Sequence, residues 1–181
     1  TLQSDASQRM TKDIMNRAYI TPKRIVTKYA GCKNNLIKDE HYLLERGNGQ
    51  SEMNRKKCCI MTSTETEKAS LLLDFGSELH GGLKLVMGSS SRREPSLVRI
   101  RFGESVGEAN SSTSNSEWKV GFSTDDHAKR DIIMEIPRDG MIEIGNTGFR
   151  FVRLDLLQNN ATISLKEISA ILRYRDIPYL G

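Results

Sequence analysis

The residues best suited to chemistry lie close together in the segment STDDHAKRD. Asp125, Asp126 and His127 could ligate a hard cation or bind sugar hydroxyls, and Arg130 could form a fork-type ion pair with Asp131. The spacing lacks the alternating acidic positions and the turn glycine of a calcium-binding loop. The pattern therefore favours a capped turn that closes a long loop, and we predict no metal or other cofactor.

A second candidate is Trp118, the only tryptophan of the chain. An exposed indole can stack on the apolar face of a sugar ring, although contact with a neighbouring domain is a competing interpretation. Trp118 follows the run SSTSNS in an irregular stretch from Glu104 to Arg130, and a loop this long is usually functional or mobile. The predicted carbohydrate-binding set is Glu104, Trp118, Asp125, Asp126, His127 and Arg130.

Glycoside cleavage by this chain alone would need two carboxylates held across the scissile bond. Candidates are Glu78, Glu104, Asp125 and Asp126, but no local motif fixes the distance between any two of them. No Ser-His-Asp or Cys-His arrangement has supporting context, and His41 is interpreted as a surface residue. We therefore predict no catalytic residue in this chain.

His80 precedes a pair of glycines, Gly81 and Gly82. Because glycine lets a backbone approach closely, the histidine could contact a ligand there. The favoured interpretation is a tight turn between a strand that ends at Phe75 and another that starts at Leu83.

The composition is that of one ordinary globular domain. The chain has 181 residues, of which 37% are hydrophobic, 28% charged and 6% aromatic. The formal net charge is +4, but the one tight basic cluster, Arg55-Lys56-Lys57, has no interleaved aromatic residue, so no nucleic-acid partner is predicted. No apolar run approaches the roughly 18 residues of a spanning helix, so no membrane partner is predicted, and the opening residues predict no signal peptide.

The three cysteines, Cys32, Cys58 and Cys59, are too few for a disulfide framework. Successive side chains of a strand point to opposite faces, so the run KKCCIMT predicts one buried and one exposed thiol. A bridge from Cys32 to one of them stays open. Packing is expected rather than metal binding, because no histidine or further cysteine lies at zinc spacing.

The elements that must position these residues are mostly strands. One helix is predicted over Ser4 to Ala18, where Met10, Ile14 and Ala18 recur at four-residue spacing. After Pro22 the apolar period changes to two, and glycine, asparagine, serine and proline divide the chain into short segments. The first predicted strands are Arg24–Tyr29, Lys57–Met61, Ser70–Phe75 and Leu83–Met87.

Later strands show a cleaner alternation. Val98, Ile100 and Phe102 alternate with Arg99 and Arg101, which predicts one face in the core and one in water. The pattern recurs with the inward residues Ile142, Ile144, Val152, Leu154 and Leu156 and the outward residues Glu143, Arg153 and Asp155.

In the last segment the alternation changes phase. Ile163 and Leu165 belong to one alternation, and Ile168, Ala170 and Leu172 belong to the other. A bulge or bend near Lys166 and Glu167 would reconcile them. About eight to ten strands in all predict an all-β antiparallel sandwich, a jelly roll or a related fold. We assign residues 1–19 to an N-terminal helical arm and residues 20–181 to the sandwich.

Five motifs follow one another along the chain. They are LLLDFGSELHGG from Leu71, RIRFGES from Arg99, the Arg130-Asp131 pair, GNTGFRFVRLDLL from Gly145 and RDIPYLG from Arg175. This ordered set resembles the N-terminal β-sandwich of the α-L-rhamnosidases of glycoside hydrolase family 78, of the type found in Bacteroidetes. The resemblance covers about residues 20–181, and RDIPYLG is its most telling part.

The resemblance implies a galactose-binding-like sandwich that packs on an (α/α)6 catalytic barrel of the same parent chain. In that family the barrel follows this region, carries the catalytic acid and base, and inverts the sugar configuration. The implied role is a non-catalytic accessory domain of a secreted or periplasmic enzyme that acts on terminal rhamnose. A stand-alone carbohydrate-binding module and a purely structural interaction domain are the alternatives.

Overall fold

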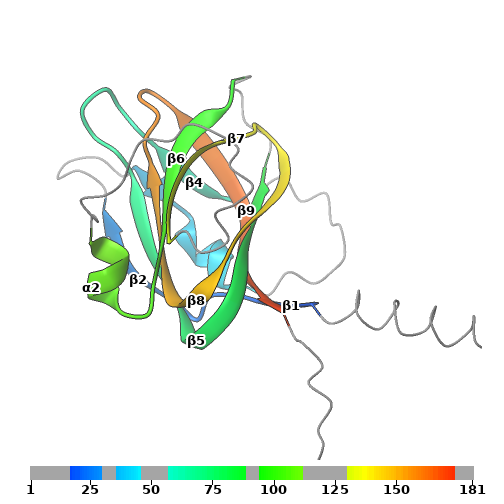
Figure 1. The fold of residues 1–181 in the computed structure, drawn as a ribbon. Coiled ribbons are helices and arrows are strands. Elements are labelled where there is room, and N and C mark those ends of the chain that lie inside the picture. The colour runs from blue at the N-terminus through cyan, green and yellow to red at the C-terminus, as the bar shows by residue number, and fades with distance from the viewer. Residues whose placement is uncertain (1–16, 30–35, 46–56, 89–93, 112–129, 174–181) are drawn as a thin grey trace, which may run out of the picture.

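The computed structural model describes residues 17–29, 36–45, 57–88, 94–111 and 130–173 (Figure 1). Within these ranges a single antiparallel sheet of nine strands folds over into two layers. The predicted all-β antiparallel sandwich is therefore confirmed. The elements are β1 (Arg17–Ile20), β2 (Arg24–Tyr29), β3 (Ile37–Lys38), the 3-10 helix η1 (Glu40–Leu44), β4 (Cys59–Thr62), β5 (Ser70–Met87), β6 (Ser96–Gly103), α2 (Val106–Asn110), β7 (Asp131–Ile136), β8 (Gly140–Leu156) and β9 (Thr162–Arg173).

Two long strands, β5 and β8, belong to both layers. Residues 70–74 of β5 pair with β2 and with the C-terminal half of β8, whereas residues 81–87 pair with β9 and with the N-terminal half of β8. Both strands bend sharply between their halves, at the lower end of the molecule in Figure 1. The first layer has the order β2-β5-β8-β6-β7, and the second contains β8, β5 and β9, with β1 and β4 paired to β9 and β3 paired to β4.

The predicted turn at Gly81 and Gly82 is wrong, because β5 runs through both glycines with shifts in its pairing register. A Cβ atom on Gly82 would lie 2.7 Å from the carbonyl oxygen of Gly145 and 2.8 Å from that of Ile144. Gly145 itself has a φ of 82° and lies against the Phe102 ring. These glycines therefore permit close approach of β5 and β8 at the bend.

The core lies between the layers and is built from alternate residues of the strands. At the bend, the Phe149 ring packs edge to face against the rings of Phe75 and Phe102, with centroids 5.8 and 5.0 Å apart. The following residues are each at most 1% exposed: Val98, Ile100, Phe102, Val152, Leu154 and Leu156. The inward sides predicted for these two strands are therefore confirmed.

The predicted irregularity near Lys166 and Glu167, a bulge or a bend, is also confirmed, and it is a bulge. Val86 of β5 pairs with Glu167 and the next residue, Met87, pairs with Leu165, so Lys166 is the extra residue. The bulge shifts the side-chain alternation of β9 by one residue.

The N-terminal prediction is only partly open to comparison. Most of the predicted helix lies outside the described residues, but its last residue, Ala18, belongs to β1 and pairs with Leu172 of β9. That part of the prediction is wrong, since pairing with an available strand edge overrides the weak preference of an isolated helical pattern. β1 includes Tyr19 and Ile20, which flank the predicted domain boundary.

Both cysteine side chains that the structure describes are buried free thiols, so the prediction of one exposed thiol is wrong. Cys59 begins β4 and faces the core, whereas Cys58 precedes the strand, where strict alternation does not apply. The Sγ atom of Cys58 lies 2.9 Å from the position that a Cβ atom on Gly88 would take. Cys32 lies outside the described residues.

Candidate functional site

Two of the six predicted site residues, Glu104 and Arg130, both lie near Gly148, beside the bend of β8. Arg130 precedes β7 and donates from Nη2 to the carbonyl oxygen of Gly148 at 3.0 Å. Glu104 follows β6, and its Oε1 atom lies 3.3 Å from the position that a Cβ atom on Gly148 would take. Residues 26 positions apart in the chain thus reach one point, because β6 and β7 are neighbouring strands.

The short helix α2 completes this group. Ser105 caps the helix by accepting from the backbone N–H of Glu108 at 3.1 Å. One carboxylate oxygen of Glu108 lies 2.7 Å from Arg130 Nη2, and the other accepts from the backbone N–H of Glu104 at 3.2 Å. We call Glu104, Glu108, Arg130 and Gly148 the corner cluster. Glu108 is absent from the predicted set, although a serine followed three residues later by a glutamate is a recognisable helix-start signal.

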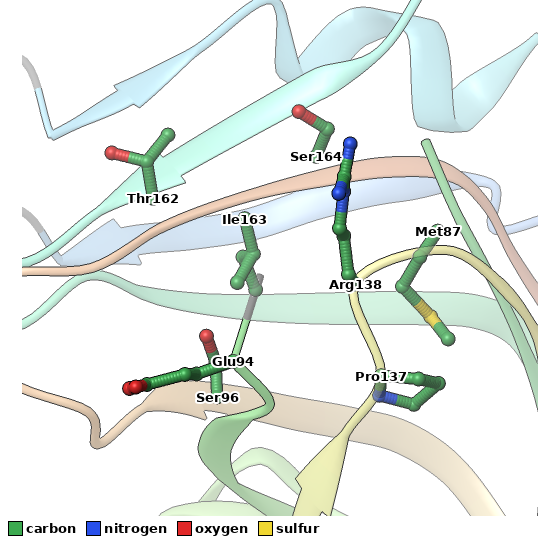
Figure 2. A pocket seen from close by; sticks show the side chains of 8 residues that line it. All are labelled: Met87, Glu94, Ser96, Pro137, Arg138, Thr162, Ile163 and Ser164. Atoms are coloured by element: carbon green, nitrogen blue, oxygen red, sulfur yellow. The ribbon is translucent and has the colours of Figure 1, made fainter. Parts of the chain in front are cut away.

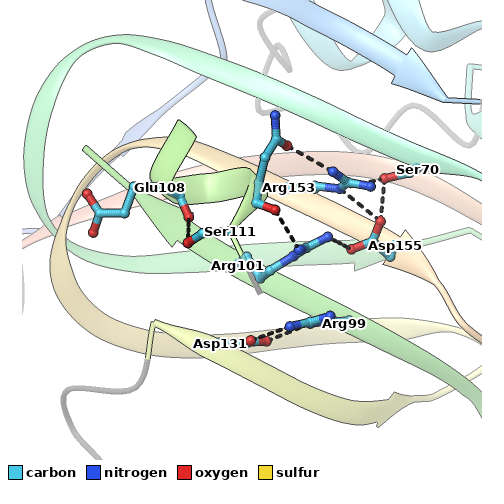
Figure 3. Close-up of polar contacts among 9 residues, drawn as sticks. Ser70, Arg99, Arg101, Glu108, Ser111, Asp131, Arg153 and Asp155 are labelled. Carbon is cyan, nitrogen blue, oxygen red and sulfur yellow. Dashed lines mark hydrogen bonds and ion pairs between the residues drawn. The ribbon is translucent and has the colours of Figure 1, made fainter. Parts of the chain in front are cut away.

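The predicted ion pair between Arg130 and Asp131 is wrong. Asp131 instead accepts two hydrogen bonds from Arg99, with Nε to Oδ1 at 2.8 Å and Nη2 to Oδ2 at 2.5 Å (Figure 3). Asp131 lies opposite Arg101 in the pairing of β7 with β6, so its side chain is on the same face as that of Arg99, two residues along β6. Arg130 precedes the strand and contacts Glu108 and Gly148 instead. The Asp131 carboxylate raises the pKa of Arg99.

A network of buried polar groups lies on the outer side of the first layer (Figure 3). Asp155 of β8 accepts from Arg101 Nη2 at 2.7 Å, from Arg153 Nε at 3.0 Å and from the Ser70 hydroxyl. Asn110 of α2 accepts from Arg101 through its backbone oxygen at 3.3 Å and from Arg153 through its side chain at 2.9 Å. The network therefore joins three strands, β5, β6 and β8, to helix α2.

This burial contradicts the prediction that the outward residues of these strands lie in water. Arg101 is only 7% exposed and Asp155 only 8%. Helix α2 packs on this face, where Ala109 joins Leu72 and Phe151 in a small apolar cluster. The alternation locates the outward side chains correctly but carries no information about what covers them.

A second group of charges ties β2, β5 and β8 together near the bend. Arg150 donates to both oxygens of Asp74, at 3.0 and 3.2 Å, and Arg24 donates to one of them at 2.8 Å. The backbone N–H of Gly76 donates to the same carboxylate at 2.7 Å. These bonds, with that from Arg150 the largest contribution, lower the pKa of Asp74 to about 2 although burial opposes them.

A shallow depression lies at the other end of the strands, between the end of β5 and the turn that joins β7 to β8 (Figure 2). Its lining includes Met87, Ser96, Pro137, Arg138 and Ile163. No aromatic side chain is among the residues that line it, so it offers no platform for a sugar ring.

The other predicted site residues, Trp118, Asp125, Asp126 and His127, lie outside the described part of the chain. His41 is exposed, as predicted. Among the residues with described positions, no three His, Cys, Asp or Glu side chains are grouped to hold a metal ion. The described helices are too short or too polar to cross a membrane.

Comparison with known proteins gives a match in structure alone, since no family model and no curated protein matches the sequence. One similar structure is a rhamnosidase from Klebsiella oxytoca with rhamnose bound, at 16% identity and a TM-score of 0.52 over 86% of this chain. Another is a Streptococcus pneumoniae fucose binding module, at 12% identity and a TM-score of 0.50 over 87% of this chain. These matches establish the fold.

The two matches differ in how much of the other protein the chain spans. It covers 29% of the rhamnosidase and 96% of the fucose binding module. The similarity in fold that the sequence motifs implied is therefore confirmed, at low identity.

Proposed function

We propose that this chain is a non-catalytic accessory β-sandwich domain of a glycoside hydrolase, an α-L-rhamnosidase that acts on terminal rhamnose of plant or other complex glycans. The observation that carries the proposal is the structural match of most of this chain to part of a rhamnosidase. The order of the rhamnosidase-like motifs supports the same assignment, because the first four lie on or directly beside β5, β6, β7 and β8 of one sandwich. The fifth motif, RDIPYLG, lies outside the described residues.

Three of the carboxylates that the structure describes support a non-catalytic role. A glycosidase needs a general acid whose pKa is raised, so that it holds a proton at working pH. The pKa of Asp74 is lowered instead, and Asp131 and Asp155 accept hydrogen bonds from arginines. The ion pairs of these three carboxylates stabilise the sandwich, and the lowered pKa makes Asp74 unsuited to donate a proton to a leaving group.

In the parent enzyme, the sandwich would pack on an (α/α)6 barrel and help to shape its substrate cleft. The corner cluster supplies carboxylate groups and a partly exposed guanidinium beside the bend, which are suited to hydrogen-bonding sugar hydroxyls. A parent that acts on such glycans would work in the periplasm or after secretion.

A stand-alone carbohydrate-binding module is the second candidate. It is favoured by the coverage of the fucose binding module, since this chain spans nearly all of that protein but less than a third of the rhamnosidase.

The mass of the natural polypeptide separates the two candidates. An antibody raised against this chain should detect a band several times larger than 20.4 kDa in extracts of the source cell. A band near 20.4 kDa would contradict the accessory-domain proposal and support the stand-alone module.

A separate assay tests whether the chain by itself hydrolyses a rhamnoside. The purified chain should release no L-rhamnose from an aryl α-L-rhamnoside. Release that disappears in Glu104→Ala would overturn the non-catalytic assignment.

A further inference from the structure

Tyr19 of β1 lies on the outer side of the second layer and reaches across two neighbouring strands. Its partner in β9 is Ile171, yet its ring lies over Lys84 of β5, with the ammonium nitrogen 4.4 Å from the ring centroid. Its hydroxyl donates to Glu143 of β8 at 3.4 Å. The ring is thereby held against the sheet, while the residue stays 45% exposed.

Polar groups border this ring. Arg17 donates from Nη1 to the other oxygen of Glu143 at 3.1 Å, and Lys84 lies 3.5 Å from Glu167. Each carboxylate oxygen has a further lone pair and Arg17 has four further N–H groups, so both can still bind hydroxyls. The two cations and two carboxylates balance, which suits a neutral ligand better than an anion.

The same face carries a second exposed apolar side chain. Met141 is 54% exposed and lies two residues before Glu143 in β8, on the same side of the strand. The described residues include three exposed large apolar side chains, Tyr19, Tyr29 and Met141, and two of them thus flank Glu143.

We propose that Tyr19, Arg17 and Glu143 form a binding site for a neutral pyranose sugar, which rests on the proposed carbohydrate-binding role of the domain. The apolar C–H face of the sugar would stack on the Tyr19 ring, and neighbouring hydroxyls would bind Glu143 and Arg17. Lys84 and Glu143 already fix the ring, so binding would cost little side-chain entropy. Met141 would contact an apolar substituent such as the methyl group of a 6-deoxy sugar.

The test is an NMR titration of the isotope-labelled 181-residue chain with methyl α-L-rhamnopyranoside, and separately with galacturonate. We expect a saturable response to the rhamnoside and a weaker one to the acid. Tyr19→Ala should raise the Kd roughly tenfold because it removes the stacking surface, whereas Tyr19→Phe should change it only about twofold.

Tyr29→Ala is the matched control. Tyr29 is 43% exposed and also has a cation on its ring, Arg153 at 4.7 Å, but it belongs to the first layer. The Tyr29→Ala variant should bind the rhamnoside with the same Kd as the unchanged chain. Circular dichroism and Tm of each variant establish that it is folded.

Three results would overturn the site. They are equal affinity of Tyr19→Ala and the unchanged chain, loss of binding in Trp118→Ala alone, and no response of the unchanged chain to the rhamnoside. The first two leave the domain as a sugar binder with its site elsewhere. The immunoblot tests the accessory-domain proposal independently of all three.

Discussion

Asp74 is held by side-chain hydrogen-bond donors that lie far from it in the sequence, so no local motif predicts them. Arg24 lies 50 residues before it and Arg150 lies 76 residues after it. The side chain of Asp74 is 2% exposed, while those of Arg24 and Arg150 are 59% and 40% exposed. A buried carboxylate with two partly exposed guanidiniums is stable only if it stays ionised.

Asp74 should make the stability of the fold depend on acid pH. Its pKa is lowered from 3.8 to about 2, so its contribution is complete above pH 3.8 and is lost as the pH falls toward about 2. The loss should be on the order of 2 kcal/mol in the free energy of unfolding. Urea denaturation at pH 5 and at pH 2 measures it.

Asp74→Asn should be less stable than the unchanged chain at pH 5, and the difference should shrink at pH 2. Asp139→Asn, at an exposed position of the turn before β8, is the matched control and should follow the unchanged chain. A constant difference between Asp74→Asn and the unchanged chain across this pH range would contradict the assignment.

Replacing Asp155 alone should lower the free energy of unfolding more than replacing Asp155 together with Arg101. Asp155→Leu leaves the buried Arg101 guanidinium without its carboxylate, which should cost about 3–5 kcal/mol. Adding Arg101→Met removes the unpaired charge and should restore part of the loss. Chemical denaturation of the single and double variants tests this, and strictly additive losses would show that the two groups are not coupled.

At the scale of elements, the bends of β5 and β8 determine how the layers close. Both strands continue from one layer into the other, and the bend needs positions without a side chain, such as Gly82. Helix α2 then covers the outer face of the first layer beside the bend. The corner cluster and the buried network both depend on this helix.

Gly82→Ala should therefore destabilise the fold by about 1–3 kcal/mol, because the new methyl group meets backbone carbonyl oxygens that cannot move aside. Gly107→Ala in α2 is the control, since a Cβ atom there has no neighbour within 4 Å. The free energy of unfolding of Gly107→Ala should equal that of the unchanged chain or exceed it by up to about 1 kcal/mol, because alanine has a higher helix propensity than glycine. Thermal unfolding compares the two, and equal Tm values would contradict the close approach of β5 and β8.

For the molecule as a whole, the two described thiols report on global unfolding. Cys59 is fully buried, and burial raises its pKa to about 12, while burial also raises the pKa of Cys58. In a Cys32→Ser background, both thiols should react with a disulfide reagent only when the sandwich opens. The labelling rate should therefore rise with urea in parallel with unfolding, and fast labelling of the native chain would contradict the burial.

The sequence by itself determined the inward faces of segments such as Val98 to Phe102, because their period of two is set by local backbone geometry. It also placed a bulge or bend near Lys166 and Glu167, since a change of phase needs an irregularity in the strand, and the pairing register identifies Lys166 as the extra residue. Only the tertiary structure decided that Arg101 and Asp155 are buried, that β5 continues through Gly82, and that Asp131 pairs with Arg99. The physical reason is that burial and ion pairing depend on which distant segments meet, whereas alternation depends only on neighbours along the chain.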